Sequence, residues 1–305
     1  MKRFVLRRVF LLFPLLLGIS IIVFSLMHVI PGDPVDIILG ETAQSADKEG
    51  LRKMLHLDKS IPKQYFLFLK DLSNGNLRSI HSKENVWKEI FERFPATAEL
   101  TFWAMFFAIS VSIPLGIMAA IKKHSFIDHA SMFISIFGIS IPHFWLGPML
   151  IILFAYWIPL FPVSEKSDFT SMVLPALTLG TAMMALLSRI TRTSMLEVIQ
   201  EEYIKTARAK GVSEFWVISK HALRNCMIPI LTIIGIQIGA LLSGSIITET
   251  IFDWPGIGSL LVQAIHARNY PLVQACVLLI ASIYVVSNLF TDILYAWTDP
   301  RIRIS

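Results

Sequence analysis

The chain has 305 residues, of which 54% are hydrophobic and only 16% are charged, and its mean hydropathy is +0.64. Soluble domains are about 45–50% apolar and about 25% charged, so this composition excludes an ordinary soluble protein and predicts one embedded in a bilayer. The formal net charge of +5 does not predict a nucleic-acid partner, because Lys and Arg gather on the predicted cytoplasmic loops, as membrane insertion alone requires.

Six stretches are long and apolar enough to cross a membrane as helices, since each crossing takes about 20 residues that satisfy their own backbone polar groups. They cover residues 9–30, 100–121, 131–158, 172–188, 227–248 and 272–296. The expected fold class is therefore an all-α integral membrane protein with six transmembrane helices. Lys and Arg are sparse on the two short loops that lie opposite the N-terminus, which carry only Lys166 and Arg268. This asymmetry places both termini in the cytoplasm.

The chain is expected to fall into three parts. Residues 1–30 form an uncleaved N-terminal transmembrane helix, because the apolar run is too long for a signal peptide and no small-residue cleavage site follows it. Residues 31–94 form an extracytoplasmic segment, whose mixed charges and apolar patches predict a small, partly helical cap. Residues 95–305 hold the other spans and a long cytoplasmic loop at 189–226.

The cytoplasmic loop (residues 189–226) is charged but strongly patterned. Its first apolar residues recur at helical spacing and predict one helix that continues from the fourth span and ends at Gly211. These residues are Leu196, Ile199, Tyr203 and Ala207. Ser213 then suits the N-cap of a second, short helix that presents Phe215 and Trp216. The aromatic pair fits either the membrane interface, where Trp is enriched, or the groove of a partner protein.

The outer loop (residues 249–270) follows the fifth span. Its residues 259–267 are apolar enough to return to the membrane edge as a short helix, and Pro271 suits the first turn of the last span. This loop and the segment 31–94 are the substantial outer features, so we expect them to form a docking surface and an outer gate. The predicted gate residues are Glu249, Asp253, Trp254, Pro255 and Gly256.

Ionisable groups are rare inside the predicted spans, although carriers driven by ion gradients usually bury such groups at mid-membrane. His143 and Gln237 are weak candidates for substrate contact, since a single polar residue in a helix bundle usually has a packing role. The sequence lacks a phosphate-binding loop, a metal-ligand cluster and a nucleophile motif. We therefore expect no catalytic or metal site, and active transport would need an ATPase on another polypeptide. A secondary carrier or channel and an intramembrane enzyme are the alternative classes.

Several motifs are specific in combination. The cytoplasmic loop reads RITRTSMLEV at 189–198, YIKTARAKG at 203–211 and HALRN at 221–225. Other matching segments are IPGDP at 30–34, PAT at 95–97, LPA at 174–176, TIFDWPGIG at 250–258 and DPRIR at 299–303. Over nearly the whole chain, these motifs resemble the permease subunits of dipeptide, oligopeptide, glutathione and nickel ABC importers. The segments at 32–35, 203–211 and 248–258 are most similar to the dipeptide branch.

Importer permeases generally carry an E-A-A…G…I-x-L-P loop that docks on the ATPase. Aligned on Gly211, this chain departs from the general form in a few places. The departures are Lys205, Thr206, His221 and Arg224. The peptide branch resembles the sequence found here instead, so these departures leave the docking role intact. The resemblance therefore favours the ATPase contact for Phe215 and Trp216.

The resemblance implies a type I ABC importer permease fold in a bacterial cytoplasmic membrane. The chain would form half of a translocation pathway for di- or oligopeptides, with nickel or glutathione as the alternative solute. Expected partners are a second related permease, two ATP-binding subunits, an extracytoplasmic solute-binding protein and membrane lipid. The chain itself would hold no cofactor, because ATP is bound by the partner subunits. The expected ATPase-coupling residues are Glu202, Tyr203, Ala207, Lys210, Gly211, Phe215, Trp216 and Arg224.

Overall fold

A computed structural model of the protein describes residues 2–29, 33–40, 44–163 and 166–298. Within these ranges the regular secondary structure is helical, apart from an isolated antiparallel bridge between Arg78 and Asn85, and turns and loops join the helices. The predicted all-α class is therefore confirmed. Parts of two quoted motifs, at 30–32 and 299–303, lie outside the described residues.

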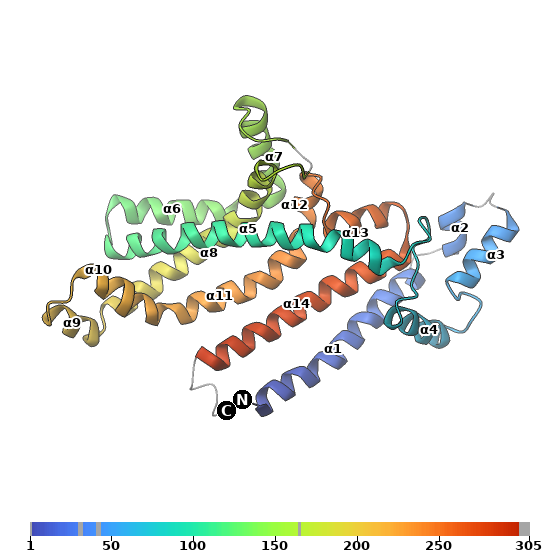
Figure 1. The fold of residues 1–305 in the computed structure, drawn as a ribbon, viewed down its shortest axis with the longest axis horizontal. Coiled ribbons are helices and arrows are strands. Elements are labelled where there is room, and N and C mark those ends of the chain that lie inside the picture. Colours follow the sequence, from blue (N-terminus) through green and yellow to red (C-terminus); the bar gives the residue numbers. More distant parts are fainter. Residues whose placement is uncertain (1, 30–32, 41–43, 164–165, 299–305) are drawn as a thin grey trace.

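The α-helices follow one another along the whole chain (Figure 1). They are α1 (Lys2–Val29), α2 (Pro34–Leu39), α3 (Ser45–Met54), α4 (Ile61–Ser73), α5 (Val86–Ile121), α6 (Phe126–Ser140), α7 (His143–Ile151), α8 (Val173–Ile199), α9 (Glu202–Ala209), α10 (Glu214–Trp216), α11 (Leu223–Gly244), α12 (Ile246–Ile251), α13 (Ile257–His266) and α14 (Tyr270–Thr298). Two π-helical turns, η1 (Ile152–Trp157) and η3 (Val217–Ala222), and a 3-10 turn, η2 (Thr170–Met172), join them.

Five of the described helices are long and apolar enough to cross a membrane, and a sixth span is added if α6 and α7 with η1 count as one. The third predicted span is therefore not a straight helix. Its two halves meet at an angle of 105°. The break follows from Pro142, because a proline disfavours helical backbone at the residue before it, and Ile141 is accordingly extended at φ −84° and ψ 120°.

Helix α5 is longer than the second predicted span, which began at residue 100. It starts at Val86, after Asn85 has accepted a 2.8 Å hydrogen bond from the Trp87 amide as the N-cap. Val86 and Ile90 are fully buried in a cluster with residues of α13 and α14. The end of the outer segment therefore continues into a membrane helix without a break, and packing against the outer loop begins there.

Helices α5, α6 and α8 lie side by side as one block (Figure 1). Their backbones approach closely at small residues: a Cβ on Gly180 would lie 2.6 Å from the Ala104 carbonyl oxygen, and one on Gly116 would lie 2.7 Å from the Ser188 carbonyl oxygen. A Cβ on Gly138 of α6 would lie 3.0 Å from the Ala185 Cβ of α8. Close packing of this kind holds membrane helices together without a hydrophobic driving force.

Helices α11, α14 and α1 form the second group, in which α14 packs on both of the others. Gly235 and Gly239 of α11 lie against Thr291 and Ser287 of α14. At one end of the molecule lie α9 and α10, at the other lie α2, α3 and α4, and α13 lies between the centre and this second end (Figure 1). The predicted cytoplasmic loop and the predicted outer features thus occupy opposite ends, as the expected topology requires. Which end faces the cytoplasm stays a prediction.

Candidate functional site

Within the cytoplasmic loop, the helix breaks at residues 200–201, which the sequence pattern did not indicate. Helix α8 ends at Ile199 and α9 starts at Glu202, so the prediction of one continuous helix to Gly211 is wrong. Glu201 is extended, at φ −66° and ψ 146°, and its carbonyl accepts the amides of α9 that would otherwise lack partners. After the break, Ala207 of the predicted stripe is buried together with Ile204, whereas Tyr203 of the stripe is 39% exposed.

Gly211 ends α9, as predicted. It has a left-handed φ of +78°, and its amide donates to the Arg208 carbonyl at 2.9 Å. The Val212 amide donates to the Ala207 carbonyl at 3.3 Å, which closes the last turn. A Cβ at Gly211 would meet nothing within 4 Å, so this position requires glycine for its backbone conformation and not for space.

The segment after Gly211 is not a separate short helix. Ser213 does occupy the N-cap position, but its side chain makes no capping bond there. Helix α10 runs on through the π-helical turn η3 into α11, so the aromatic pair stands at the tip of the fifth span. Arg208 donates to both carboxylate oxygens of Glu214, at 3.1 and 2.6 Å, and so links α9 to α10. These hydrogen bonds to Glu214 raise the pKa of the Arg208 guanidinium further, so it stays charged.

Tyr203 connects α9 to the start of α11. Its hydroxyl accepts a 2.6 Å hydrogen bond from Asn225 Nδ2 and lies 3.5 Å from the His221 carbonyl, to which it donates. Glu202 beside it is exposed and forms a 2.7 Å ion pair with Lys205. Helix α9 is therefore held at both ends, by Tyr203 to η3 and α11 and by Arg208 to α10. The loop is a folded unit.

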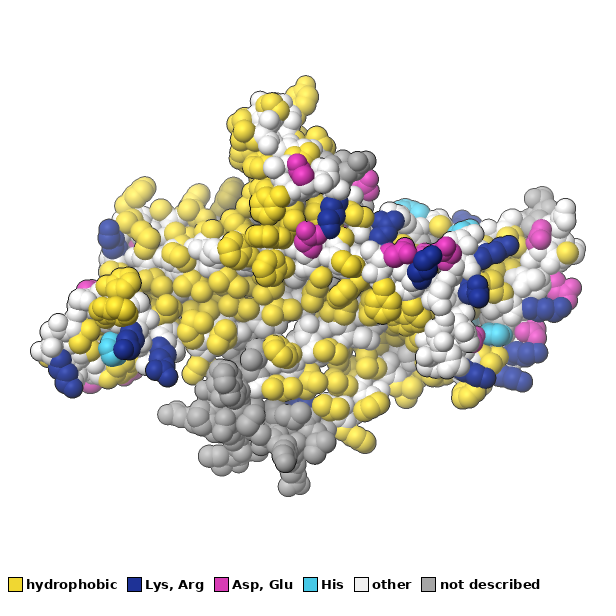
Figure 2. All heavy atoms as spheres, in the orientation of Figure 1, with side chains coloured by type: hydrophobic (Ala, Val, Ile, Leu, Met, Phe, Trp, Pro, Cys, Tyr) yellow, Lys and Arg dark blue, Asp and Glu magenta, His cyan; other side chains and the backbone are white. Residues whose placement is uncertain are grey.

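Phe215 and Trp216 remain uncovered on this unit. Their side chains are 70% and 55% exposed, and the two rings form an edge-to-face pair with centroids 5.4 Å apart. Figure 2 shows hydrophobic side chains gathered at the end of the molecule where α9 and α10 lie, with Lys and Arg side chains beside them. Lys210 and Arg224 are exposed and make no ion pair with any described residue. An apolar centre with cations around it is the composition of a protein-binding surface.

In contrast to the exposed aromatic pair of the cytoplasmic loop, the outer loop is organised around the fully buried carboxylate of Glu249. Oε1 accepts hydrogen bonds from Thr97 Oγ1 at 2.8 Å and Ser245 Oγ at 2.7 Å. Oε2 accepts from the Ser259 amide at 3.1 Å. Thr97 Oγ1 also accepts from the Ile257 amide at 2.9 Å. The carboxylate thereby connects α5, α12 and α13. The predicted set omitted all three donors, of which Thr97 stands in the quoted PAT segment.

Trp254 and Gly256 complete this buried centre. Trp254 is 1% exposed, and its Nε1 donates to the Ala96 carbonyl at 2.9 Å. A Cβ at Gly256 would lie 2.3 Å from a Glu249 carboxylate oxygen, so only glycine leaves room for that side chain. Asp253 is exposed with a left-handed φ of 47°, and Pro255 is half-buried. The five predicted gate residues therefore lie close together in α12 and in the turn that follows it. Asp253 is the one among them that is exposed.

The two weak substrate candidates lie on different elements. His143 begins α7, and its Nδ1 contacts the Thr178 carbonyl at 3.0 Å, so Nδ1 carries the hydrogen. This contact ties the bend after α6 to α8. Gln237 is half-buried on α11. Their roles in substrate contact stay predictions.

Two family models match the chain. The one described as binding-protein-dependent transport system inner membrane component matches residues 112–304. The N-terminal model of the same transport systems matches residues 1–101. Together they include the outer segment, the cytoplasmic loop and the outer loop.

Full-length relatives are similar to the chain at about the same level. The dipeptide transport system permease protein DppB of Escherichia coli K12 is 43% identical over 99% of both chains. The protein of the same name from Alkalihalophilus pseudofirmus is 42% identical over 99% of this chain and all of its own length. The glutathione transport system permease protein GsiC of Escherichia coli K12 is 40% identical over 99% of both chains.

The fold has a counterpart among solved structures. The MetNI methionine ABC transporter, in an inward-facing crystal form, contains a chain that aligns with 79% of this chain and 100% of its own length, with a TM-score of 0.52 and 17% identity. At this identity the likeness concerns the fold alone. It agrees with the expected importer permease architecture.

Proposed function

Because the chain belongs to the binding-protein-dependent transport system inner membrane components, we propose that it forms half of the translocation pathway of an ATP-driven importer for dipeptides or short oligopeptides. The ATPase activity belongs to separate subunits, and a second related permease forms the other half of the pathway. An extracytoplasmic solute-binding protein delivers the solute at the outer end. Both termini face the cytoplasm.

One observation supports this function most directly, which is the exposed pair Phe215 and Trp216 on a folded loop. A permease that does not hydrolyse ATP has to receive the motion of its ATPase through a contact. An aromatic anchor in a groove of the partner supplies such a contact, and Lys210 and Arg224 beside it fit an acidic rim. ATP binding by the partner subunits would then bias the pathway between inward-open and outward-open states.

The solute follows from the relatives, since the dipeptide permeases are 41–43% identical to the chain. The glutathione permeases are 40–41% identical over the same share of the chain, so glutathione, itself a short peptide, is the alternative. Nickel is the third solute to test.

The experiment is uptake by proteoliposomes that hold the chain together with its partner permease, ATPase and binding-protein subunits. A radiolabelled dipeptide should enter only when ATP is present on the loop side, and uncouplers should have no effect. Unlabelled dipeptide should compete, while glutathione and Ni²⁺ should not. Uptake that persists without ATP and collapses with an uncoupler would instead identify a secondary carrier. Competition by glutathione alone would change the solute and leave the importer assignment in place.

A further inference from the structure

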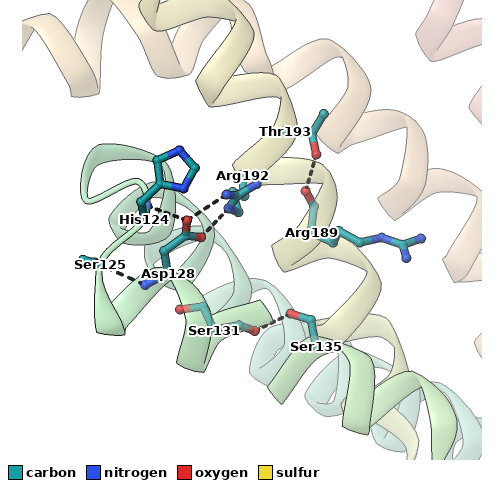
Figure 3. Close-up of polar contacts among 8 residues, drawn as sticks. All are labelled: His124, Ser125, Asp128, Ser131, Ser135, Arg189, Arg192 and Thr193. Atoms are coloured by element: carbon teal, nitrogen blue, oxygen red, sulfur yellow. Dashed lines mark hydrogen bonds and ion pairs between the residues drawn. The ribbon is translucent and has the colours of Figure 1, made fainter. Parts of the chain in front are cut away.

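An ion pair lies between α6 and α8, where the cytoplasmic loop begins (Figure 3). The side chain of its arginine, Arg192, is 19% exposed. Asp128 is 2% exposed. Arg192 donates to it twice, with Nε 2.5 Å from Oδ1 and Nη2 2.8 Å from Oδ2. This fork-to-fork geometry fixes both the distance and the orientation of the two helices.

The Asp128 carboxylate is also fastened to its own helix. Oδ2 accepts a 3.0 Å hydrogen bond from the His124 amide, and Ser125 Oγ accepts the Asp128 amide at 3.4 Å in return. This is a capping arrangement at the start of α6, where a negative charge is also favoured by the helix dipole. Because the Asp128 carboxylate is itself fixed at the start of α6, its bonds to Arg192 hold α8 to that end of α6.

Contacts between α6 and α8 continue along both helices away from this pair. After Arg192 and Asp128, Gly138 lies against Ala185, and His143 then contacts the Thr178 carbonyl at 3.0 Å. Residue numbers fall along α8 as they rise along α6, as they do between antiparallel neighbours. The segment from α6 into α7 is thus attached to α8 at its start, in its middle and at its bend.

Beyond the bend, α7 reaches the outer loop. A Cβ at Gly147 would lie 3.2 Å from Ile251 Cγ2 and 3.3 Å from Phe252 Cε2, so the backbone of α7 packs directly on the end of α12. Helix α12 carries Glu249, whose carboxylate organises the outer loop. An unbroken series of packed contacts therefore leads from the cytoplasmic end of α8 to the outer loop.

We propose that Asp128 and Arg192 are positioning residues that lock α6 to α8, so that movement of the cytoplasmic loop is passed through α6 and α7 to the outer loop. The inference rests on the proposed function. Arg192 lies two turns before the end of α8, after which α9 begins, so motion delivered to the loop reaches this pair first. A buried ion pair adds little net stability compared with apolar side chains of the same volume. Its physical advantage here is a fixed register between two helices that have to move together.

The test uses the reconstituted importer and measures two quantities, the labelled dipeptide taken up per ATP hydrolysed and the ATPase that co-purifies with the permease. Asp128→Asn, Arg192→Gln and the double variant are compared with Lys123→Gln. The control removes an exposed charge near the start of α6 that makes no ion pair with any described residue. Arg192→Lys keeps the charge with a single directed donor.

We expect Asp128→Asn and Arg192→Gln each to lower the dipeptide-to-ATP ratio about tenfold, within the range of typical coupling between distant sites. Co-purification and basal ATP hydrolysis should stay at the wild-type level. The double variant should be no worse than either single variant, because both remove the same interaction. Arg192→Lys should be intermediate, and it carries the test if the neutral variants do not assemble.

An unchanged ratio in these variants would overturn the inference, and so would a loss of ATPase association that parallels the loss of uptake, because the pair would then only support the docking loop. Failure of the proposed function looks different. In that case the wild-type complex shows no ATP-dependent uptake of any of the three solutes.

Discussion

The outer loop and the cytoplasmic loop both carry specific motifs with a tryptophan, but the side chains of one are buried and hydrogen-bonded within the chain and those of the other are exposed. Trp254 of the outer loop is 1% exposed and hydrogen-bonded within the chain, whereas Trp216 of the cytoplasmic loop is 55% exposed. The carboxylate of Glu249 has three donors from its own chain. Lys210 and Arg224 have no acidic partner among the described residues.

This difference in burial distinguishes a motif that stabilises the fold from a motif that is free to contact a partner. Residues of the outer loop are required because the fold around them is tight, so a change there should first damage the chain itself. The exposed residues of the cytoplasmic loop, such as Phe215 and Trp216, contribute little to the chain's own packing, so a change at these positions should first damage an assembly. The same residue type, tryptophan, should therefore give opposite phenotypes at the two ends.

The largest effect is expected for Trp254→Ala. Truncating a buried aromatic costs about 3–5 kcal/mol through lost packing and the cavity left behind, and the Ala96 carbonyl loses its donor as well. Thermal unfolding of the purified permease in detergent should show a clear fall in stability. Trp157→Ala, which removes a 70% exposed tryptophan, is the matched control and should leave the unfolding temperature unchanged. A Trp254 variant as stable as the wild type would contradict the distinction between the loops.

Phe215→Ala with Trp216→Ala should do the reverse. Removing an interface anchor costs about 2 kcal/mol or more of binding free energy, which raises the dissociation constant roughly 30-fold for each anchor. Co-purification of the ATPase should therefore be lost, while the unfolding temperature of the isolated permease stays the same, because neither ring is buried within the chain. Full ATPase association in this double variant would place the aromatic pair at the membrane interface instead.

Glu249→Gln tests whether the buried carboxylate is needed for its charge or only for its shape. A glutamine fills the same volume, but its amide nitrogen donates and cannot replace an acceptor. In either orientation at least one of the three donors around it loses its acceptor, which costs about 1–3 kcal/mol. We expect lower stability of the permease with normal ATPase association. Equal loss of both would show that the outer loop is not independent of the cytoplasmic end.

Much of this fold could be predicted because its signals are local. Hydropathy located the spans, and Gly211 marked a helix end, where the backbone is left-handed in the structure. Each of these depends on a residue and its close neighbours in sequence. The proposed docking role of the cytoplasmic loop required the resemblance to a family, because exposure alone does not identify a partner.

Features that depend on contacts across the fold were not predictable. The apolar pattern continues through Ile141 and Pro142 and through the turn at Gln200, so periodicity did not reveal either break, although Pro142 was a signal for the first. Of the partners of Glu249, Thr97 lies 152 residues away in the sequence, and Ser259 lies beyond the turn that follows α12. Arg192 stands in a quoted motif, but its pairing with Asp128 on another helix is visible only in the structure.

Gly211→Val should have a smaller effect, confined to the cytoplasmic loop. A left-handed backbone costs about 1–2 kcal/mol for a residue with a Cβ, and a β-branched residue tolerates it least. Because a side chain at this position meets nothing within 4 Å, the strain should displace α10 without damaging the core. Weaker ATPase association at an unchanged unfolding temperature is the expected result. Gly211→Asn is the control, since asparagine tolerates this backbone, and a valine variant that behaves like it would remove the conformational requirement.

The smallest effect is expected for Lys210→Ala and Arg224→Ala. The dependence of ATPase association on salt concentration tests their role and distinguishes the cytoplasmic loop from the outer loop. Exposed ion pairs contribute only about 0–1 kcal/mol, so each single variant should bind the ATPase nearly normally. Their contribution should fall as added KCl shortens the Debye length from about 10 Å at 0.1 M to about 3 Å at 1 M. ATPase association of the wild type should therefore weaken modestly with salt, and the double variant should lose this dependence while keeping its aromatic anchor. Since the Glu249 centre is buried and its bonds are internal, permease stability should respond little over the same salt range. A wild-type association that is indifferent to salt would show that the cations face no acidic rim.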